Sequence, residues 1–221
     1  MNIILVIAPH PDDETLGCGG TLLKHQQKGD TLNWLIATSI SGLKTDDSSI
    51  KNRKNLIDKV SKSYNFDKTY SLNFPTTTLD TIPKKEIINK FEKIFIELQP
   101  NIIYIPYRLD AHSDHEVVFD AAVACAKTFR CPSIKSIRCY QTISETEFGS
   151  RPEDPGFRPN LFVDISEVFN EKIEILKLYQ EELGEHPFPR SIDSIKAQSL
   201  LNGSVSGCDY AESFLIIKEI Q

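Results

Sequence analysis

The stretch NIILVIAPHPDDETLGCGGTLLKHQQKGD, residues 2–30, decides the fold expected for this chain of 221 residues. Residues 3–8 form a continuous apolar, β-branched run, which is typical of a strand buried on both faces of a parallel sheet. Apolar residues then recur at helical spacing from Leu16 to Leu23. The stretch therefore predicts a strand that leads into a helix, with one histidine and three acids in the turn: His10, Asp12, Asp13 and Glu14.

The same alternation continues along the chain. Patterns of period two or of continuous apolar residues predict strands at 31–39, 68–74, 101–106, 135–142 and 159–165. Amphipathic spacing predicts helices at 49–64, 84–99, 114–129 and 167–182. Residues 210–220 fit either a strand or a helix, and proline-rich loops are expected at 148–160 and 183–191. This order favours an α/β fold with a mostly parallel sheet, in a single domain that spans residues 1–221.

The composition, 40% hydrophobic and 25% charged, is that of a soluble globular protein. A net charge of -6 without a clustered Lys/Arg stripe argues against nucleic-acid binding, because phosphate contacts need concentrated positive charge. The 5 cysteines contain no C-x-x-C pair, so neither a disulfide framework nor a thiolate zinc site is indicated. No apolar segment suits a signal peptide or a membrane span, and we expect a cytoplasmic protein without membrane insertion.

Acid-and-histidine clusters follow two of the expected strands. The first is residues 10–14 and the second is HSDHE, residues 112–116, with Asp110 close before it. Ligands bind beyond the carboxyl ends of parallel strands, so both clusters should share one rim. Carboxylates crowded there need a positive partner, and a divalent metal is the simplest one. Imidazole and carboxylate ligands fit catalytic zinc, with iron and manganese as alternatives. Helix capping would explain Asp13, Glu14 and Asp114 one at a time, but it does not explain two such clusters after two separate strands.

The motifs APHPDDE (8–14) and HSDHE (112–116) resemble the paired signatures of the PIG-L/LmbE family of zinc-dependent deacetylases, which act on N-acetylglucosaminyl compounds and related amides. This resemblance implies a Rossmann-like three-layer α/β/α fold and one Zn²⁺ per chain. Weaker similarities extend over most of the chain, at 52–66, 159–166, 186–198 and 210–214. One position departs from the family, which often has Glu three residues after an arginine of the second helix, where this chain has Leu56.

The resemblance also implies roles for individual residues. His10, Asp13 and His115 resemble the three metal ligands, and Asp12 resembles the general base that takes a proton from water and delivers it to the leaving amine. His112 resembles the residue that stabilises the tetrahedral oxyanion.

Four further residues are candidates near this site. Asp114 is placed to hydrogen-bond a histidine and set its protonation. Arg53 resembles the family arginine that reaches sugar hydroxyls or an attached acidic group. His186 lies on a proline-flanked loop that would roof a sugar pocket, and Arg190 would pair with a substrate carboxylate or phosphate. His25, well inside the first helix, is expected to be a solvated surface residue.

These features predict metal-dependent hydrolysis of an N-acetyl amide on an amino sugar or sugar conjugate. A metal-dependent phosphohydrolase is an alternative, although Arg53 is then the main basic candidate for the phosphate. A non-catalytic, metal-containing sugar-binding module would require the loss of a catalytic position, whereas Asp12 and His112 are both present. The expected partner is a small amino-sugar substrate, and a homo-oligomer is an open alternative to a monomer.

Overall fold

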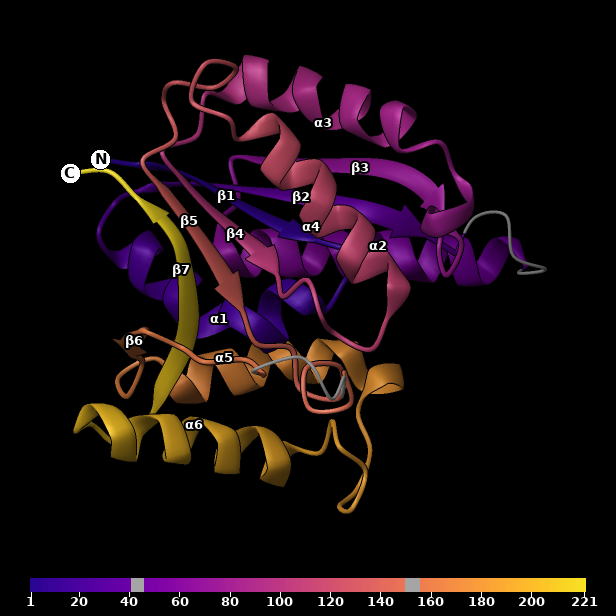
Figure 1. Ribbon diagram of the computed structural model, residues 1–221. Coiled ribbons are helices and arrows are strands. Elements are labelled where there is room, and N and C mark those ends of the chain that lie inside the picture. Colours follow the sequence, from indigo (N-terminus) through magenta and orange to yellow (C-terminus); the bar gives the residue numbers. More distant parts are fainter. Residues whose placement is uncertain (41–45, 150–155) are drawn as a thin grey trace.

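The computed structural model describes residues 1–40, 46–149 and 156–221, which form a seven-stranded sheet with helices on both faces (Figure 1). The strands are β1 (Ile3–Ala8), β2 (Thr31–Ser39), β3 (Lys68–Pro75), β4 (Ile102–Pro106), β5 (Ser136–Tyr140), β6 (Leu161–Asp164) and β7 (Ala211–Glu219). The α-helices are α1 (Asp13–Gln27), α2 (Asp47–Tyr64), α3 (Lys84–Leu98), α4 (Ser113–Cys125), α5 (Phe169–Leu176) and α6 (Ile192–Ser206). Two short 3₁₀ helices, η1 (Leu79–Thr81) and η2 (Lys177–Glu182), complete the elements.

The sheet has the order β3-β2-β1-β4-β5-β7-β6 and is mostly parallel, as predicted. Strand β1 pairs in parallel with β2 on one side and β4 on the other, and β7 is antiparallel to both β5 and β6. The tail at 210–220 thus forms a strand. Because the connections from β1 and β3 lead to opposite sides of β1, the carboxyl ends of β1 and β4 flank a topological switch point, where ligands bind in such sheets.

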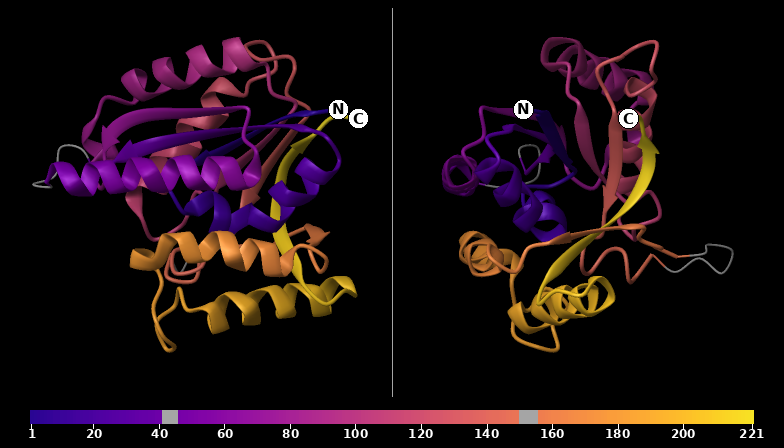
Figure 2. Two further views of the ribbon diagram at one scale, coloured as in Figure 1. Left: turned by 180° about the vertical axis from the view of Figure 1, so that it is seen from behind. Right: turned by 90° about the vertical axis from the view of Figure 1, so that its left-hand side faces the viewer.

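Two hydrophobic cores hold the layers together, one on each face of the sheet. Alternate residues of β1 point to opposite faces: Ile4 and Val6 join the core with α1 and α5, whereas Leu5 and Ile7 join the core with α3 and α4. Figure 2 shows these two helix groups on either side of the sheet. The central strands are therefore buried on both faces, which explains their uninterrupted apolar sequences.

Helix α1 packs unusually close to the sheet. A Cβ atom at Gly17 would overlap the ring of Tyr140, and one at Gly20 would overlap Ile165, so these glycines allow close packing. The prediction for His25 was wrong: its ring is buried, 2.7 Å from Asp30 and 2.9 Å from the Tyr104 hydroxyl, because α1 lies against the sheet along its whole length.

The predicted helix over 167–182 is divided in two. Helix α5 ends at Leu176, and η2 continues with non-helical dihedral angles at Tyr179. Among the described helices, none combines the length and the hydropathy that crossing a bilayer requires.

Candidate active site

The turn between β1 and α1 has a constrained backbone. Asp12 has a φ of 152°, in the region that favours glycine. Its N–H donates to Glu14 Oε2 at 3.1 Å, and the N–H of His10 donates to Asp13 Oδ2 at 2.9 Å. Strained residues of this kind concentrate at functional sites. Here the constrained turn directs two carboxylates and an imidazole to the rim of the sheet.

The three residues expected to bind a metal lie together. Asp13 Oδ2 is 3.3 Å from His10 Nδ1 and 3.4 Å from His115 Nε2, and one ligand atom from each residue falls within 4.8 Å of the others. Asp13 Oδ1 is buried and has no hydrogen-bond partner within the described part of the chain. The other ring nitrogen of His115 is 2.7 Å from Asp110 Oδ2. Carboxylates in that position orient histidine ligands of metals.

His10, His112 and Asp114 form a second group with ligand atoms within 4.8 Å. Both oxygens of Asp114 are already engaged: Oδ1 accepts the N–H of Leu79 at 3.1 Å, and Oδ2 accepts the N–H of Thr77 at 2.8 Å and contacts His10 Nε2 at 3.1 Å. His112 Nδ1 accepts the N–H of Asp114 at 3.1 Å. This group therefore orients His10 and His112, whereas the first group contains the free carboxylate oxygen.

The carboxylates of the cluster favour positive charge on its two imidazoles. Burial lowers the pKa of His10, but hydrogen bonds to Asp114 and Asp13 outweigh it and raise the pKa to about 9. For His115, Asp13 and Asp110 outweigh burial and raise the pKa to about 10. The two imidazoles in turn hold the pKa of Asp13 well below its ordinary value, although burial opposes them. A divalent cation would supply the same charge in place of two protons.

Asp12 is 3% exposed and is held by Arg190. Arg190 Nη1 donates to Asp12 Oδ2 at 2.7 Å, while Asp12 Oδ1 has no hydrogen-bond partner among the described residues. Burial, helped by Asp13, raises the pKa of Asp12 well above its ordinary value, and Arg190 opposes that rise. Arg190 also donates to Ser144 Oγ at 2.7 Å and to Glu145 Oε1 at 3.1 Å. Its guanidinium, expected to meet a substrate anion, is thus bound to acids of the protein.

Glu14 has a larger part in the site than a helix-terminal acid would have. Its side chain is fully buried and accepts hydrogen bonds from Thr15 Oγ1 and Tyr179 Oη, both at 2.6 Å. Burial raises the pKa of Glu14 to about 7, although these hydrogen bonds oppose the rise. Because Glu14 also accepts a hydrogen bond from the N–H of Asp12, it stabilises the strained turn.

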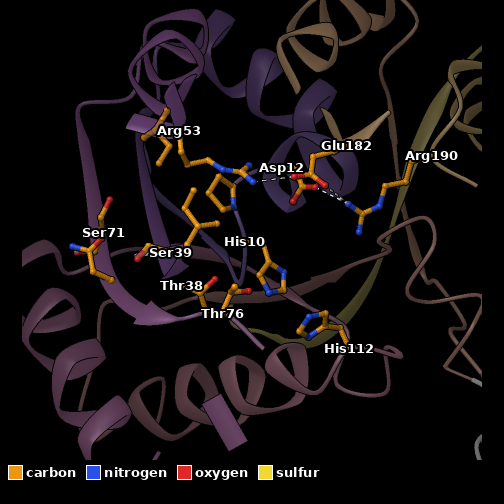
Figure 3. Close-up of a pocket in the computed structure, with 14 residues that line it drawn as sticks. His10, Asp12, Thr38, Ser39, Arg53, Ser71, Thr76, His112, Glu182 and Arg190 are labelled. Atoms are coloured by element: carbon orange, nitrogen blue, oxygen red, sulfur yellow. Dashed lines mark hydrogen bonds and ion pairs between the residues drawn. The ribbon is translucent and has the colours of Figure 1, made fainter. Parts of the chain in front are cut away.

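A cavity of about 260 Å³ opens beside this cluster. His10, Asp12 and His112 lie toward one end, and Ser71 lies at the other (Figure 3). Polar groups of β2, of β3 and of the turn after β3 also line the cavity, among them Thr38, Ser39, Asn73 and Thr76. The cavity thus combines apolar wall residues, such as Ile57, with a small number of polar and titratable groups, the combination that small-molecule sites show.

Arg53 lines this cavity, and its Nη2 donates to Glu182 Oε1 at 3.0 Å. Glu182 was not predicted; it lies 129 residues away in sequence, and no local signal identifies it. Leu56 occupies the position where the family often has Glu, and it packs against the hydrophobic core. His186 is exposed and is not among the residues that line the cavity. Its role as part of a roof over a sugar pocket stays a prediction.

Comparisons with known proteins show the family to which both clusters belong. The model of the PIG-L family, described as GlcNAc-PI de-N-acetylase, matches residues 5–126, which include both acid-and-histidine clusters. The diacetylchitobiose deacetylase of Thermococcus kodakarensis is 25% identical over 227 residues, covering 98% of this chain and 84% of that protein. An uncharacterized deacetylase of Escherichia coli is 28% identical over 189 residues, covering 80% of this chain and 90% of that protein.

Solved structures share the fold. A conserved protein of Thermus thermophilus has a TM-score of 0.78 and 25% identity, covering 100% of this chain and 97% of its own. The N,N'-diacetylchitobiose deacetylase of Pyrococcus horikoshii also has a TM-score of 0.78, with 21% identity over 98% of this chain and 84% of that one. The predicted three-layer α/β fold is therefore confirmed.

Proposed function

The chain belongs to the PIG-L family, and from this premise we propose that it is a metal-dependent deacetylase of an N-acetylated amino sugar or sugar conjugate. The reaction would hydrolyse the amide and release acetate and a free amine. The observation that carries the proposal is the cluster of His10, Asp13 and His115 beside the buried Asp12, at one end of the cavity. The names of relatives, two of them deacetylases of diacetylchitobiose, support an N-acetyl sugar.

The cluster fits a divalent cation by its donor set. Two imidazole nitrogens and a carboxylate oxygen are ligands of catalytic zinc, and Asp13 retains a buried oxygen with no partner in the described ranges. His10, Asp13 and His115 would hold the ion, with Zn²⁺ preferred and Fe²⁺ or Mn²⁺ as alternatives. When bound, such an ion polarises the amide carbonyl and makes the attacking water more acidic.

In this proposal Asp12 transfers the protons. Arg190 holds its Oδ2, which leaves Oδ1 to accept the proton of the attacking water and to return it to the leaving amine. His112 accepts a backbone hydrogen bond at Nδ1, so its neutral ring carries the proton on Nε2. That N–H would donate to the oxyanion of the tetrahedral intermediate.

Amine release from N-acetylglucosamine and its conjugates tests the proposal. We expect release that stops with a chelator and returns with Zn²⁺. We expect Asp12→Asn to lower kcat by about 10²- to 10⁴-fold, the range for general acid–base catalysis. Asp58→Asn, a matched change of an exposed carboxylate on α2, should retain wild-type activity. Release that survives both the chelator and Asp12→Asn would exclude this function, and release of phosphate from sugar phosphates would support the phosphohydrolase instead.

A further inference from the structure

Helix α1 is interrupted between its first turn and the rest of its length. Cys18 has a φ of -146° and a ψ of 21°, which are not helical, and Gly17, Gly19 and Gly20 surround it. Glycine is among the weakest helix formers, so the sequence itself weakens the helix at this point. The segment before the interruption contains Asp13. Continuity of the helix therefore does not determine the direction of the turn to which Asp13 belongs.

An ion pair from two other elements occupies the interruption. Lys172 of α5, which runs beside α1 (Figure 1), lies 2.8 Å from Glu212 of β7, and their side chains are only 3% and 4% exposed. Lys172 Nζ donates to Leu16 O at 3.0 Å, and the N–H of Gly20 donates to Glu212 Oε1 at 2.8 Å. In a continuous helix the N–H of Gly20 would donate to Leu16 O, four residues earlier. The ion pair thus takes the place of one helical hydrogen bond.

The two charged groups also match the helix ends that they contact. Glu212 Oε2 accepts the N–H of Thr21 at 2.7 Å and the Thr21 hydroxyl at 2.6 Å, so this carboxylate binds the N–H groups at the start of the second segment. Free N–H groups at the start of a helix favour a negative group, and free carbonyls at the end of a helix favour a cation. Glu212 therefore caps the second segment, and Lys172 caps the first.

The surroundings offer no substitute for the ion pair. The cavity that adjoins it measures about 10 Å³, which is enough for one water at most. A Cβ atom at Gly19 would overlap the Tyr64 hydroxyl and lie 3.3 Å from Lys172 Cγ, so α1 and α5 are in close contact. The backbone of α1 itself must therefore accommodate any change in the ion pair.

We propose that Lys172 and Glu212 are positioning residues of the metal site, whose ion pair holds the first turn of α1 in the direction that brings Asp13 to His10 and His115. Neither of the two belongs to the metal-ligand groups or to the lining of the cavity beside them. They act through the backbone at Leu16, three residues after Asp13. The inference rests on the proposed function only for the role of Asp13 as a metal ligand.

Without the ion pair, the backbone of α1 has another way to satisfy its polar groups. Leu16 O and the N–H of Gly20 would be buried without partners, which costs free energy. They regain partners by bonding to each other, and this joins the two segments into one continuous helix. The first turn then changes direction, and Asp13 moves with it.

Metal affinity tests the position of Asp13 without turnover. Competition with a chromophoric chelator gives the Kd for Zn²⁺, and the visible absorption of bound Co²⁺ depends on the number and arrangement of its ligands. Lys172→Met/Glu212→Met replaces the ion pair by two apolar side chains, an exchange that buried pairs often tolerate, whereas Lys172→Met alone leaves an unpaired charge. We expect the urea midpoint of the double variant to exceed that of Lys172→Met. The Kd for Zn²⁺ should nevertheless be about tenfold above that of the wild type in both variants, with a changed Co²⁺ spectrum.

A destabilised variant elsewhere separates positioning from stability. Phe95 is buried in the core on the opposite face of the sheet, at the end of α3 that leads into β4 and away from the metal rim. Phe95→Leu should lower the urea midpoint and retain the wild-type Kd for Zn²⁺ and the wild-type Co²⁺ spectrum.

A wild-type Kd and an unchanged Co²⁺ spectrum in Lys172→Met/Glu212→Met would overturn the inference. An equal loss of affinity in Phe95→Leu would also overturn it, because metal affinity would then follow stability alone. The proposed function fails separately: a wild-type protein that binds Zn²⁺ but releases no amine would refute the deacetylase and leave the positioning role standing.

Discussion

Replacement of Arg190 should disable Asp12 while leaving the metal cluster intact. Arg190→Met keeps most of the aliphatic stem and removes the guanidinium, which lies 2.7 Å from Asp12 Oδ2. The Asp12 side chain is 4% exposed and that of Arg190 is 16% exposed, so water would replace the lost contact poorly. Asp12 would then lose its orientation and its nearest cation.

The size of this effect follows from the contact. A hydrogen bond to a charged group contributes about 1.5–3 kcal/mol, which corresponds to roughly a 10- to 150-fold loss in kcat/KM if it acts fully in the transition state. Arg190 also opposes the rise in the pKa of Asp12 that burial causes. Without it that pKa rises further. Because the general base must be ionised, the acidic limb of the kcat/KM profile should move to higher pH.

The assay is amine release across a pH series, with metal content measured for each protein. Arg190→Lys should be intermediate, because an ammonium keeps the charge but not the fork that reaches Asp12 and Glu145 together. Arg130→Met is the matched control, since Arg130 is 41% exposed and 3.9 Å from Glu92. Wild-type kcat/KM and an unmoved acidic limb in folded Arg190→Met would refute the reasoning.

Three other changes should act through metal affinity or stability. Asp110→Asn should weaken metal binding about tenfold, because Asp110 Oδ2 contacts His115 Nδ1 at 2.7 Å and such partners support ligand histidines; competition with a chromophoric chelator measures it, and an unchanged affinity would contradict it. Lys172→Met should lower the unfolding free energy by about 3 kcal/mol, since it leaves Glu212, whose side chain is 4% exposed, without the ammonium 2.8 Å away; a urea midpoint like that of the wild type would count against this. Burial lowers the pKa of His25 below 6.5 in the folded state, so the unfolded chain takes up this proton first and stability should fall as pH drops below 6.5; urea unfolding of His25→Gln should show less of this fall.

The parallel part of the sheet could be predicted because local patterns encode it. Residues 3–8 and 102–106 carry no charged or amide side chain, as is typical of strands buried on both faces. The placement of β7 between β5 and β6 could not be predicted from local patterns. It depends on pairing between residues that are distant in sequence, such as Cys139 and Leu215. The interruption of the predicted helix at Tyr179 likewise depends on tertiary contacts. The Tyr179 hydroxyl donates to Glu14, which lies 165 residues away in sequence.

The proximity of His10, Asp13 and His115 could be predicted for a related reason. His10 and Asp13 share one turn, and a second turn contains His115, so the topology brings two short motifs to the same rim. The surroundings of Asp12 are different. Arg190 lies 178 residues from Asp12 in sequence. Whether its guanidinium contacts Asp12 or a substrate anion depends on the position of the loop before α6. Sequence patterns identify such an arginine but not its partner.

The orientation of Arg53 in the cavity depends on Glu182, which is distant from it in sequence. An acid at position 56 would pair with Arg53 within α2, and that pair would form wherever the helix lies. In this chain the acid comes from η2, so the ion pair exists only while η2 packs against α2. Arg53, which lines the cavity, is thus oriented by tertiary packing. Loss of the ion pair between Arg53 and Glu182 would therefore loosen the packing of η2, whose Tyr179 donates a hydrogen bond to Glu14, the residue that also accepts the N–H of Asp12.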